Sequence, residues 1–360
     1  MALPPLTRSR MVAQSLTAPS FASPAAAVAA FGAMQGQDLP GVLASAALRS
    51  TGEAVAAVFD DLAERRLVRG YPMRGTVFLM AAEDLSWVTA LCAAPSLRAA
   101  AARRHQLGLD EEQLGRARGI AEEVLADGPL SRPELFEIWD AAGLAPKGGR
   151  GYHLLFTLIA DGVAAYGPWN GSEQDVVLVE QWLPGIPGLA ERFGGERLPA
   201  VAEFLLRYLT SHGPATLRDF AWWTKLTLGE IRRALPLIVD RLETDGADEP
   251  SYWRPGLLDE AQAQARASSA PLLLPGFDEY ILGYQDRLFA MSATHHSRLV
   301  PGNNGVFRRT VLIGGRVRGT WARAGRPGRR SLEIEEFEPI TDAARKRLAA
   351  RFAAFPFAGD

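Results

Sequence analysis

Two glutamines near the start of the chain, Gln35 and Gln37, have a type and a spacing that could serve one chemical site. A side-chain amide both donates and accepts hydrogen bonds. On a helix, residues two apart point about 200° away from each other, so the pair shares a site only if the helix ends there. Gly36, Asp38 and Pro40 favour such an ending, because proline disfavours helical backbone at the preceding residue. We interpret the segment as a kinked junction between two helices, although by spacing alone a solvated or capping pair is commoner.

Two adjacent carboxylates, Asp278 and Glu279, stand out in the segment LLLPGFDEYILGYQDR. A buried aspartate that accepts hydrogen bonds from backbone amides is the commoner role for such a residue, and a role of Asp278 in a site stays open. We take Asp38 and Asp278 as the acidic residues that would support a site around the glutamines.

Histidine and cysteine spacing argues against the common metal sites. Cys92 is the single cysteine, so neither an intramolecular disulfide nor a cysteine zinc cluster can form. No glycine-rich phosphate loop follows a strand, and no serine lies in a nucleophile elbow. Neither zincin nor zinc-finger spacing occurs among the histidines, which are His105, His153, His212, His295 and His296. We therefore expect no metal and no cofactor.

Charge is distributed unevenly along a chain whose net charge is only −2. No acidic residue occurs between Arg287 and Leu332, a stretch that is rich in arginine. The planar arginine side chain donates two hydrogen bonds at once to phosphate, so the stretch favours a DNA-binding surface over a merely solvated one. The residues predicted to contact DNA are Arg74, Arg287, Arg298, Arg308, Arg309, Arg316, Arg318 and His296.

The elements that must position these residues repeat along the chain. Residues 119–143 and 201–226 each begin with a helical apolar pattern, break at a Gly-Pro pair and restart at a capping residue, Ser131 or Thr216. An acidic residue follows each cap by three positions, which is the layout of a capping box. A third helix and a β-leaning segment come next. Helix, turn, helix, third helix and hairpin is the order of a winged helix, a common DNA-binding module.

A weaker copy of this pattern fits the N-terminus. It predicts helices over 24–34, 40–49 and 53–66, and then a hairpin with Gly70 and Pro72 in its turn. Residues 83–118 are expected to be helical and to connect this copy to the second one.

The last part of the chain is predicted to be rich in strands. A hairpin with a Gly314-Gly315 turn, one more strand and a helix starting at Thr341 are expected. The fold class is therefore α+β, with three tandem winged-helix modules, a small C-terminal β-barrel or sheet unit and a terminal helix. The predicted domains are 1–115, 116–195, 196–264 and 265–360.

Composition is ordinary for a globular protein, at 48% hydrophobic and 22% charged residues. The N-terminus lacks the layout of a signal peptide, and no apolar run is long enough for a membrane span. We expect a cytoplasmic, nucleoid-associated protein that has no membrane partner. Nothing indicates a dimerisation helix, so a monomer is expected.

The chain resembles the winged-helix DNA-binding-domain family that includes the AlkZ- and YcaQ-type DNA glycosylases. The resemblance covers nearly the whole chain and rests on MQGQDLPG, RRLVRGYPMRGTVFLMAAEDL, SHGPATLRDFAWWTKL, LLLPGFDEYILGYQDR and NGVFRRTVLIGGRVRGTW. It implies three winged helices and a C-terminal β-barrel around a DNA channel. It also implies a monofunctional glycosylase that excises cationic N7-alkylguanine, including bulky natural-product adducts or interstrand crosslinks, in repair or self-resistance.

The family's catalytic Gln-x-Gln motif falls on Gln35 and Gln37. The middle residue is often larger and apolar in the family, whereas here it is Gly36. Two other functions stay open. One is a non-catalytic DNA-binding protein, either a regulator or a DNA-protecting factor. The other is a small-molecule-binding protein whose pocket would be lined by tryptophans, namely Trp222, Trp223, Trp253 and Trp321.

Overall fold

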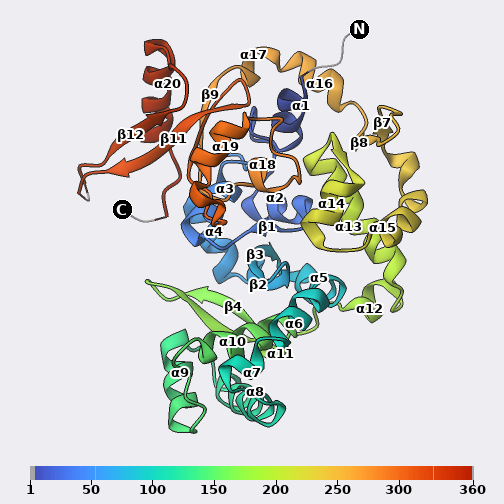
Figure 1. Cartoon of the computed structure of the whole chain (residues 1–360), viewed down its shortest axis with the longest axis vertical. Coiled ribbons are helices and arrows are strands. Elements are labelled where there is room, and N and C mark those ends of the chain that lie inside the picture. The colour runs from blue at the N-terminus through green and yellow to red at the C-terminus, as the bar shows by residue number, and fades with distance from the viewer. Residues whose placement is uncertain (1–4, 53, 327, 359–360) are drawn as a thin grey trace. The chain divides into compact units, whose positions relative to one another are not determined.

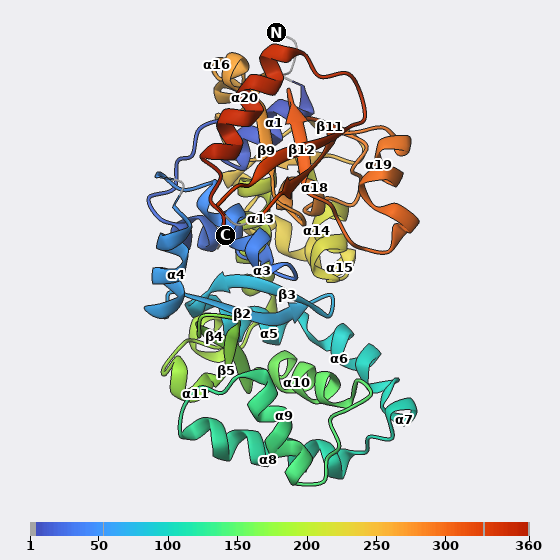
Figure 2. The same cartoon turned by 90° about the vertical axis from the view of Figure 1, so that its left-hand side faces the viewer.

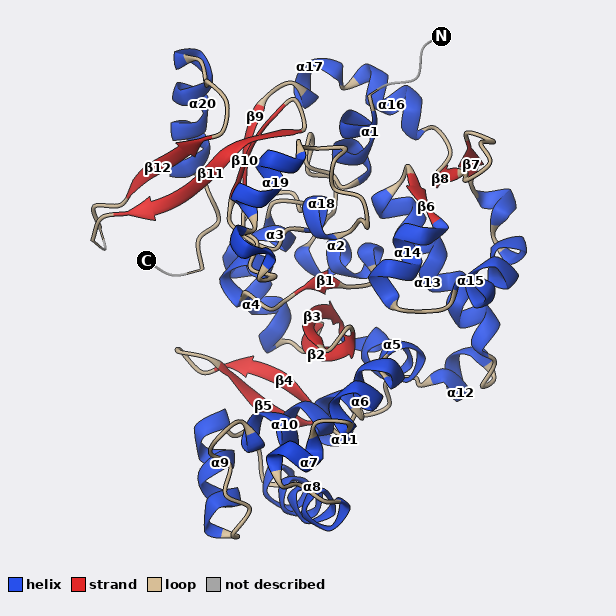
Figure 3. Cartoon of the chain, in the orientation of Figure 1, coloured by secondary structure: helices blue, strands red, loops and turns tan. Residues whose placement is uncertain are grey.

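The computed structural model describes residues 5–52, 54–326 and 328–358. The chain divides into two compact units. The first unit comprises Met1–Val58 and Ala202–Asp360, and the second unit comprises Phe59–Val201. Helices and small antiparallel sheets occur in both units (Figure 1, Figure 3), so the expected mixture of helices and strands is confirmed. The domain boundaries expected at 115, 195 and 264 stay predictions.

The second unit contains the hairpin expected after the first repeat, formed by β2 (Leu67–Met73) and β3 (Thr76–Ala81). Its turn is Arg74-Gly75, with φ of 58° and 67°, and a two-residue hairpin turn needs such positive values. The prediction of Gly70 and Pro72 in this turn was wrong. Both lie within β2, where the pairing register shifts after Gly70. Gly70 pairs in register with Phe78, and the register shift spans Pro72.

The second repeat has its elements in the expected order: α8 (Glu111–Ala126), α9 (Arg132–Ala141), α10 (Arg150–Ala160), β4 (Ala164–Trp169) and β5 (Gln174–Leu178). The capping box at Ser131 is confirmed. Its hydroxyl accepts a hydrogen bond from the N–H of Glu134, and the Glu134 carboxylate accepts one from the N–H of Ser131 at 2.8 Å. Leu135 and Trp139 on α9 are buried in the core of this unit. Strands β3, β2, β4 and β5 lie in that order in one sheet.

Short helices complete the second unit, and the first of them confirm the helical connection expected over 83–118. They are η1 (Ala82–Asp84), α5 (Leu85–Cys92), α6 (Ala94–Ala101), α7 (Arg104–Leu107), α11 (Val179–Trp182) and α12 (Leu189–Phe193).

The N-terminal part of the first unit contains α1 (Leu6–Ala13), α2 (Pro24–Phe31), β1 (Met34–Gln35) and α3 (Leu39–Ala47), and then α4 (Val55–Ala63) begins. The helix expected over 24–34 was predicted too long. Gly32, which follows α2, has φ of +80°, and a Cβ there would lie 2.6 Å from the ring of Phe204. Only glycine fits this backbone and this contact, so the helix ends at Phe31. Residue 53, the expected start of the third helix, lies outside the described residues.

The third repeat contains α13 (Arg197–His212), β6 (Ala215–Thr216), α14 (Leu217–Thr224), α15 (Leu228–Ala234), η2 (Leu235–Leu237), η3 (Val239–Arg241), β7 (Glu243–Thr244) and β8 (Ser251–Trp253). The capping box at Thr216 is confirmed. The N–H of Asp219 donates to the Thr216 hydroxyl at 3.1 Å, and the N–H of Thr216 donates to the Asp219 carboxylate at 3.0 Å. Strands β6, β8 and β7 form a small antiparallel sheet in that order.

The remaining elements are α16 (Leu257–Ala263), α17 (Ala265–Ser268), β9 (Pro271–Leu274), α18 (Glu279–Leu282), α19 (Ala293–Leu299), η4 (Pro301–Asn303), β10 (Thr310–Ile313), β11 (Arg316–Ala324), β12 (Ser331–Glu336) and α20 (Asp342–Ala353). The Gly314-Gly315 turn between β10 and β11 and the Thr341 cap of α20 are confirmed. Strands β12, β11, β10 and β9 form a four-stranded antiparallel sheet, against which α20 packs (Figure 2).

Candidate active site

The two glutamines lie at a junction between two helices, as their sequence suggested. Gln35 is the last residue of the short strand β1 and is 6% exposed, whereas Gln37 lies in the following bend and is exposed. Asp38 takes the N-cap position of α3 with extended backbone. The backbone is therefore non-helical from Gln35 to Asp38, and the two amides differ in their access to solvent.

The backbone of Gln35 is held by a buried carboxylate. The N–H of Gln35 donates to Oε1 of Glu279 at 2.6 Å, and Glu279 is 1% exposed. Its other oxygen, Oε2, accepts from the indole N–H of Trp223 at 3.2 Å and lies 3.4 Å from Nε2 of His212. Burial lowers the pKa of His212 despite the nearby carboxylate, so the ring is neutral at pH 7.

Asp278 anchors the helix that follows the junction. Its carboxylate accepts two hydrogen bonds from the guanidinium of Arg49, one from the hydroxyl of Ser45 and one from the N–H of Tyr280. Burial alone raises the pKa of Asp278, but Arg49 and the hydrogen bonds outweigh burial and hold it below its ordinary value. Asp278 is therefore a charged, fully partnered residue that ties α18 to the end of α3.

Two glycines let the junction pack closely against the loop before α18. A Cβ on Gly41 would lie 2.7 Å from Oδ2 of Asp38 and 2.9 Å from the carbonyl oxygen of Gly276. A Cβ on Gly276 would lie 2.8 Å from the carbonyl oxygen of Phe307 and 3.6 Å from Oδ2 of Asp38. The Asp38 carboxylate, Gly276 and the backbone at Phe307 are therefore neighbours, and Arg308 and Arg309 come directly after Phe307.

Arg287 lies against aromatic rings near this loop. Its guanidinium carbon is 4.7 Å from the ring centroid of Trp222 and 5.0 Å from that of Phe307, and its Nε–H donates to the carbonyl of Ile281 at 3.1 Å. Burial lowers the pKa of Arg287. Burial, followed by the charge of Arg287, also lowers the pKa of His296, so His296 is neutral at pH 7. The arginine therefore carries the positive charge at this place.

The arginine-rich stretch is free of acids in the sequence but not in space. The antiparallel pairing of β11 with β12 places the glutamates of β12 beside it. Arg298 and Arg308 both donate to the carboxylate of Glu335, at 2.9 and 3.1 Å, and Arg318 pairs with Glu338. Part of the positive charge that the sequence concentrates here is thus offset within the fold.

The other arginines predicted to bind DNA have different surroundings. Arg309 lies 5.2 Å from the ring centroid of Trp321 and helps to line an open pocket of about 650 Å³ on β11 and β12. Arg316 is exposed at the start of β11. Arg74 lies at the turn of the β2–β3 hairpin in the second unit, with its guanidinium 5.0 Å from the ring centroid of Phe78.

The chain matches the family described as DNA glycosylase AlkZ-like over residues 28–356. It belongs to the AlkZ-like DNA glycosylase family. The solved structure of Streptomyces sahachiroi DNA glycosylase AlkZ is similar, with a TM-score of 0.77 and 22% identity, covering 98% of this chain and 95% of that chain. At this identity the likeness shows a shared fold. No curated protein matches the chain in a sequence search. Membership of an AlkZ-like DNA glycosylase family implies that the chain binds DNA.

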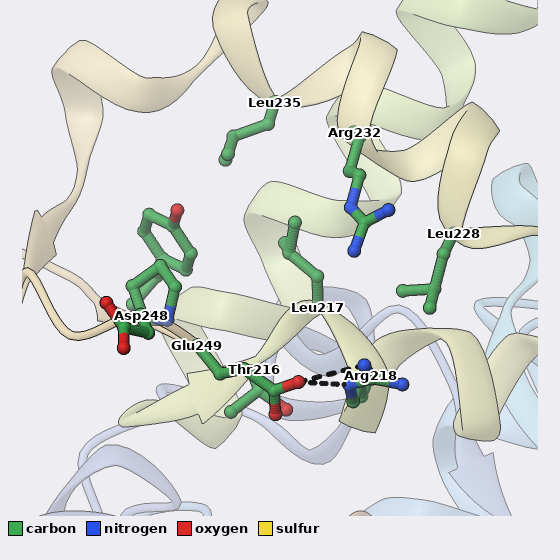
Figure 4. Close-up of a pocket in the computed structure, with 10 residues that line it drawn as sticks. Thr216, Leu217, Arg218, Leu228, Arg232, Leu235, Asp248 and Glu249 are labelled. Atoms are coloured by element: carbon green, nitrogen blue, oxygen red, sulfur yellow. Dashed lines mark hydrogen bonds and ion pairs between the residues drawn. The ribbon is translucent and has the colours of Figure 1, made fainter.

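A smaller pocket in this AlkZ-like chain, of about 240 Å³, lies between α14, α15 and β8 and contains neither glutamine (Figure 4). Leucines and Tyr252 line it together with Arg232, and the ion pair of Arg218 with Glu249 lies at its edge. Within the described residues there is no cluster of histidine, cysteine and acidic side chains suited to a metal. Over the same residues, no helix is both long and apolar enough to span a membrane.

Sequence reasoning missed Glu279 as a residue of the candidate site, although it named the adjacent Asp278. The signal was present, because an acidic pair inside an otherwise apolar segment must find partners when it is buried. The sequence offered no way to identify those partners, since the N–H of Gln35 is 244 positions away along the chain.

Proposed function

We propose that this chain is a monofunctional DNA glycosylase that excises cationic N7-alkylguanine from double-stranded DNA. Bulky natural-product adducts and interstrand crosslinks belong to the proposed substrates, in DNA repair or self-resistance. The observation that carries the proposal is the non-helical junction bearing Gln35 and Gln37, in a chain of the AlkZ-like DNA glycosylase family.

The chemistry suits two modest amide side chains. An N7-alkylated guanine already carries a positive charge, so it departs without a strong acid. The bond between N9 and C1′ breaks with its electron pair going to N9, which neutralises the purine, and the sugar passes through an oxocarbenium-like transition state. Water adds its oxygen to C1′ and loses a proton to the solvent, leaving free base and an abasic site. Carbonyl dipoles placed near C1′ stabilise the developing positive charge.

The different exposure of the two glutamines supports a division of roles. Gln37 is exposed, so it is the amide that meets the damaged nucleotide. Gln35 is 6% exposed, which favours a role in holding the attacking water. Asp38 is half-buried at the start of α3, where it supports the bend that carries Gln37. Asp278 supports the same junction by binding Ser45 in α3 and Arg49 in the turn after it.

We also propose that the three helical repeats are winged-helix modules, with the boundaries given by the sequence, and that a monomer grips DNA. Arg287, Arg309 and Arg316 lie in the part of the chain that follows the third repeat, and Arg74 lies at a hairpin turn in the second unit. In this proposal these arginines meet phosphates, together with Arg298, Arg308, Arg318 and the neutral His296.

A base-release assay tests the proposal. The protein is incubated with duplex DNA containing N7-methylguanine or a bulky N7 adduct, and free base and abasic sites are measured. The double variant Q35A/Q37A should lower the rate at least about 100-fold while leaving DNA affinity within about twofold. Intact DNA binding with no base release from any N7-guanine adduct would sink the proposal and favour a non-catalytic DNA-binding protein.

A further inference from the structure

Glu279 is a buried carboxylate that is surrounded by N–H donors. Oε1 faces the backbone N–H of Gln35, and Oε2 faces Trp223 and His212. Because a carboxylate only accepts hydrogen bonds, we assign the proton of the neutral imidazole to Nε2, which lies 3.4 Å from Oε2. Nδ1 lies 2.9 Å from the Ser211 hydroxyl, whose single proton is shared between Nδ1 and the carbonyl oxygen of Arg207 at 2.8 Å. Three N–H groups from three separate segments therefore converge on one side chain.

Glu279 and its sequence neighbour Asp278 contact opposite sides of the junction that contains Gln35 and Gln37. Glu279 holds Gln35, on the N-terminal side of the bend. Asp278 holds Ser45 and Arg49, which belong to α3 and the turn after it, on the C-terminal side. Two consecutive residues at the start of α18 thus fix both flanks of the bend that contains Gln37.

The contact between Glu279 and Gln35 links a buried carboxylate to the main chain of the junction. The N–H of Gln35 is outside any helix, and its hydrogen bond to Glu279 is short, at 2.6 Å. Both oxygens of Glu279 are occupied by N–H donors, and the residue is 1% exposed, so it does not reach DNA itself. The direct contact of Glu279 with the glutamine junction is its hydrogen bond to the backbone of Gln35.

We propose that Glu279 is a positioning residue for base excision, which holds the main chain of Gln35 so that the Gln35 and Gln37 amides meet the lesion in a fixed geometry. This inference rests on the proposed glycosylase function of the two glutamines. A displacement of a reacting group by about 1 Å can lower a rate about 100-fold. Loss of the Glu279–Gln35 hydrogen bond, which we call the clamp, should therefore reduce the rate of excision rather than DNA binding.

The variant E279Q tests the clamp with little change in volume. Its amide places N–H groups against a site that already supplies only donors, so the hydrogen bonds to Trp223, His212 and Gln35 cannot all persist. Under single-turnover conditions on duplex DNA containing N7-methylguanine, E279Q should lower the excision rate about 10- to 100-fold. The dissociation constant for the same DNA should stay within about twofold, and each rate is corrected for the folded fraction measured by circular dichroism.

Glu243 provides the matched control. It also accepts from a tryptophan, Trp253 at 2.8 Å, and from a backbone N–H, Gly256 at 3.1 Å, but neither partner belongs to the junction. The variant E243Q should therefore excise at the wild-type rate. If E279Q does not fold, W223F replaces it, because this variant removes one donor and leaves the Glu279 carboxylate in place. W223F should lower the excision rate about 3- to 10-fold, a smaller effect than loss of the whole clamp.

A double-mutant cycle with Q35A decides whether Glu279 acts through Gln35. The expected result is that E279Q, or W223F in its place, lowers the rate by a clearly smaller factor in the Q35A background than in the wild type, since one of the two positioned amides is already absent. Two results would overturn the inference while Q35A/Q37A stays inactive. One is the same fold-reduction of the excision rate by E279Q in the Q35A background as in the wild type, and the other is a wild-type excision rate for folded E279Q. Wild-type excision by Q35A/Q37A would instead overturn the proposed function.

Discussion

Arg49 and Asp278 form a two-point ion pair in the interior of the first unit. Nη1 of Arg49 lies 2.9 Å from Oδ2 of Asp278, and Nη2 lies 2.8 Å from Oδ1. The two side chains are 0% and 1% exposed, so water hardly screens the attraction between them. The pair joins the start of α18 to the turn after α3, which is the helix that follows the candidate catalytic bend.

Breaking this pair from one side should be strongly destabilising. Arg49→Met leaves the Asp278 carboxylate buried without its counter-charge, so we expect the free energy of unfolding to fall by about 3–5 kcal/mol. The double variant R49M/D278N should lose less than the sum of the two single variants, because it removes both charges. Guanidinium denaturation measures these differences, and a wild-type unfolding midpoint for R49M would contradict the expectation.

The stability of the protein should fall in mild acid through His212. Its folded pKa lies below the ordinary value of 6.5, so below pH 6.5 the unfolded chain binds a proton that the folded chain does not. This contribution to stability is complete above pH 6.5 and is lost as the pH falls from there to the folded pKa. His212→Gln keeps an N–H donor towards Glu279 and cannot titrate. Its unfolding free energy should change less than that of the wild type between pH 7.5 and 5.5, and equal changes would rule out this role.

Close packing at Gly276 should make this position intolerant of alanine. A Cβ there would lie 2.8 Å from the carbonyl oxygen of Phe307, which is backbone, so the loop or the bend must shift. We expect Gly276→Ala to lower the excision rate about 10-fold or more. Gly229→Ala in α15 is the control, because nothing lies within 4 Å of its added Cβ, and alanine there should stabilise the protein by about 0.5–1 kcal/mol. Equal excision rates for the two variants would show that the contact at Gly276 is unimportant.

Glu335 should weaken DNA binding, because its carboxylate accepts from both Arg298 and Arg308. Glu335→Gln leaves these arginines with more positive charge to offer to phosphates, so affinity for duplex DNA should rise, most strongly at low salt. Arg316→Ala should lower the affinity and reduce the slope of log affinity against log salt by about 1. Fluorescence anisotropy at several salt concentrations measures both effects, and an unchanged affinity of E335Q would show that the two arginines do not face DNA.

Local sequence was sufficient where a structure depends on residues a few positions apart. The capping boxes at Ser131 and Thr216 and the Gly314-Gly315 turn are correct because each requires only a side chain and a backbone within about three residues. The junction at Gln35 and Gln37 could be inferred for the same reason, since proline and capping residues interrupt a helix locally. The hairpin turn at Arg74-Gly75 was misplaced because Gly70 and Pro72 carry stronger turn signals than the residues that form it.

Tertiary structure decided what depends on residues far apart along the chain. The ring of Phe204 leaves no room for a Cβ at Gly32, the residue after α2, and the carboxylate of Glu279 holds the backbone of Gln35. Glu335 of β12 pairs with both Arg298 and Arg308 and offsets part of a positive charge that looked unopposed in the sequence. Sequence alone therefore determined which side chains were available for chemistry and where the capped helices begin. Only folding decided which charges remain free and which groups hold the glutamines, because hydrogen bonds and ion pairs depend on distances in space rather than along the chain.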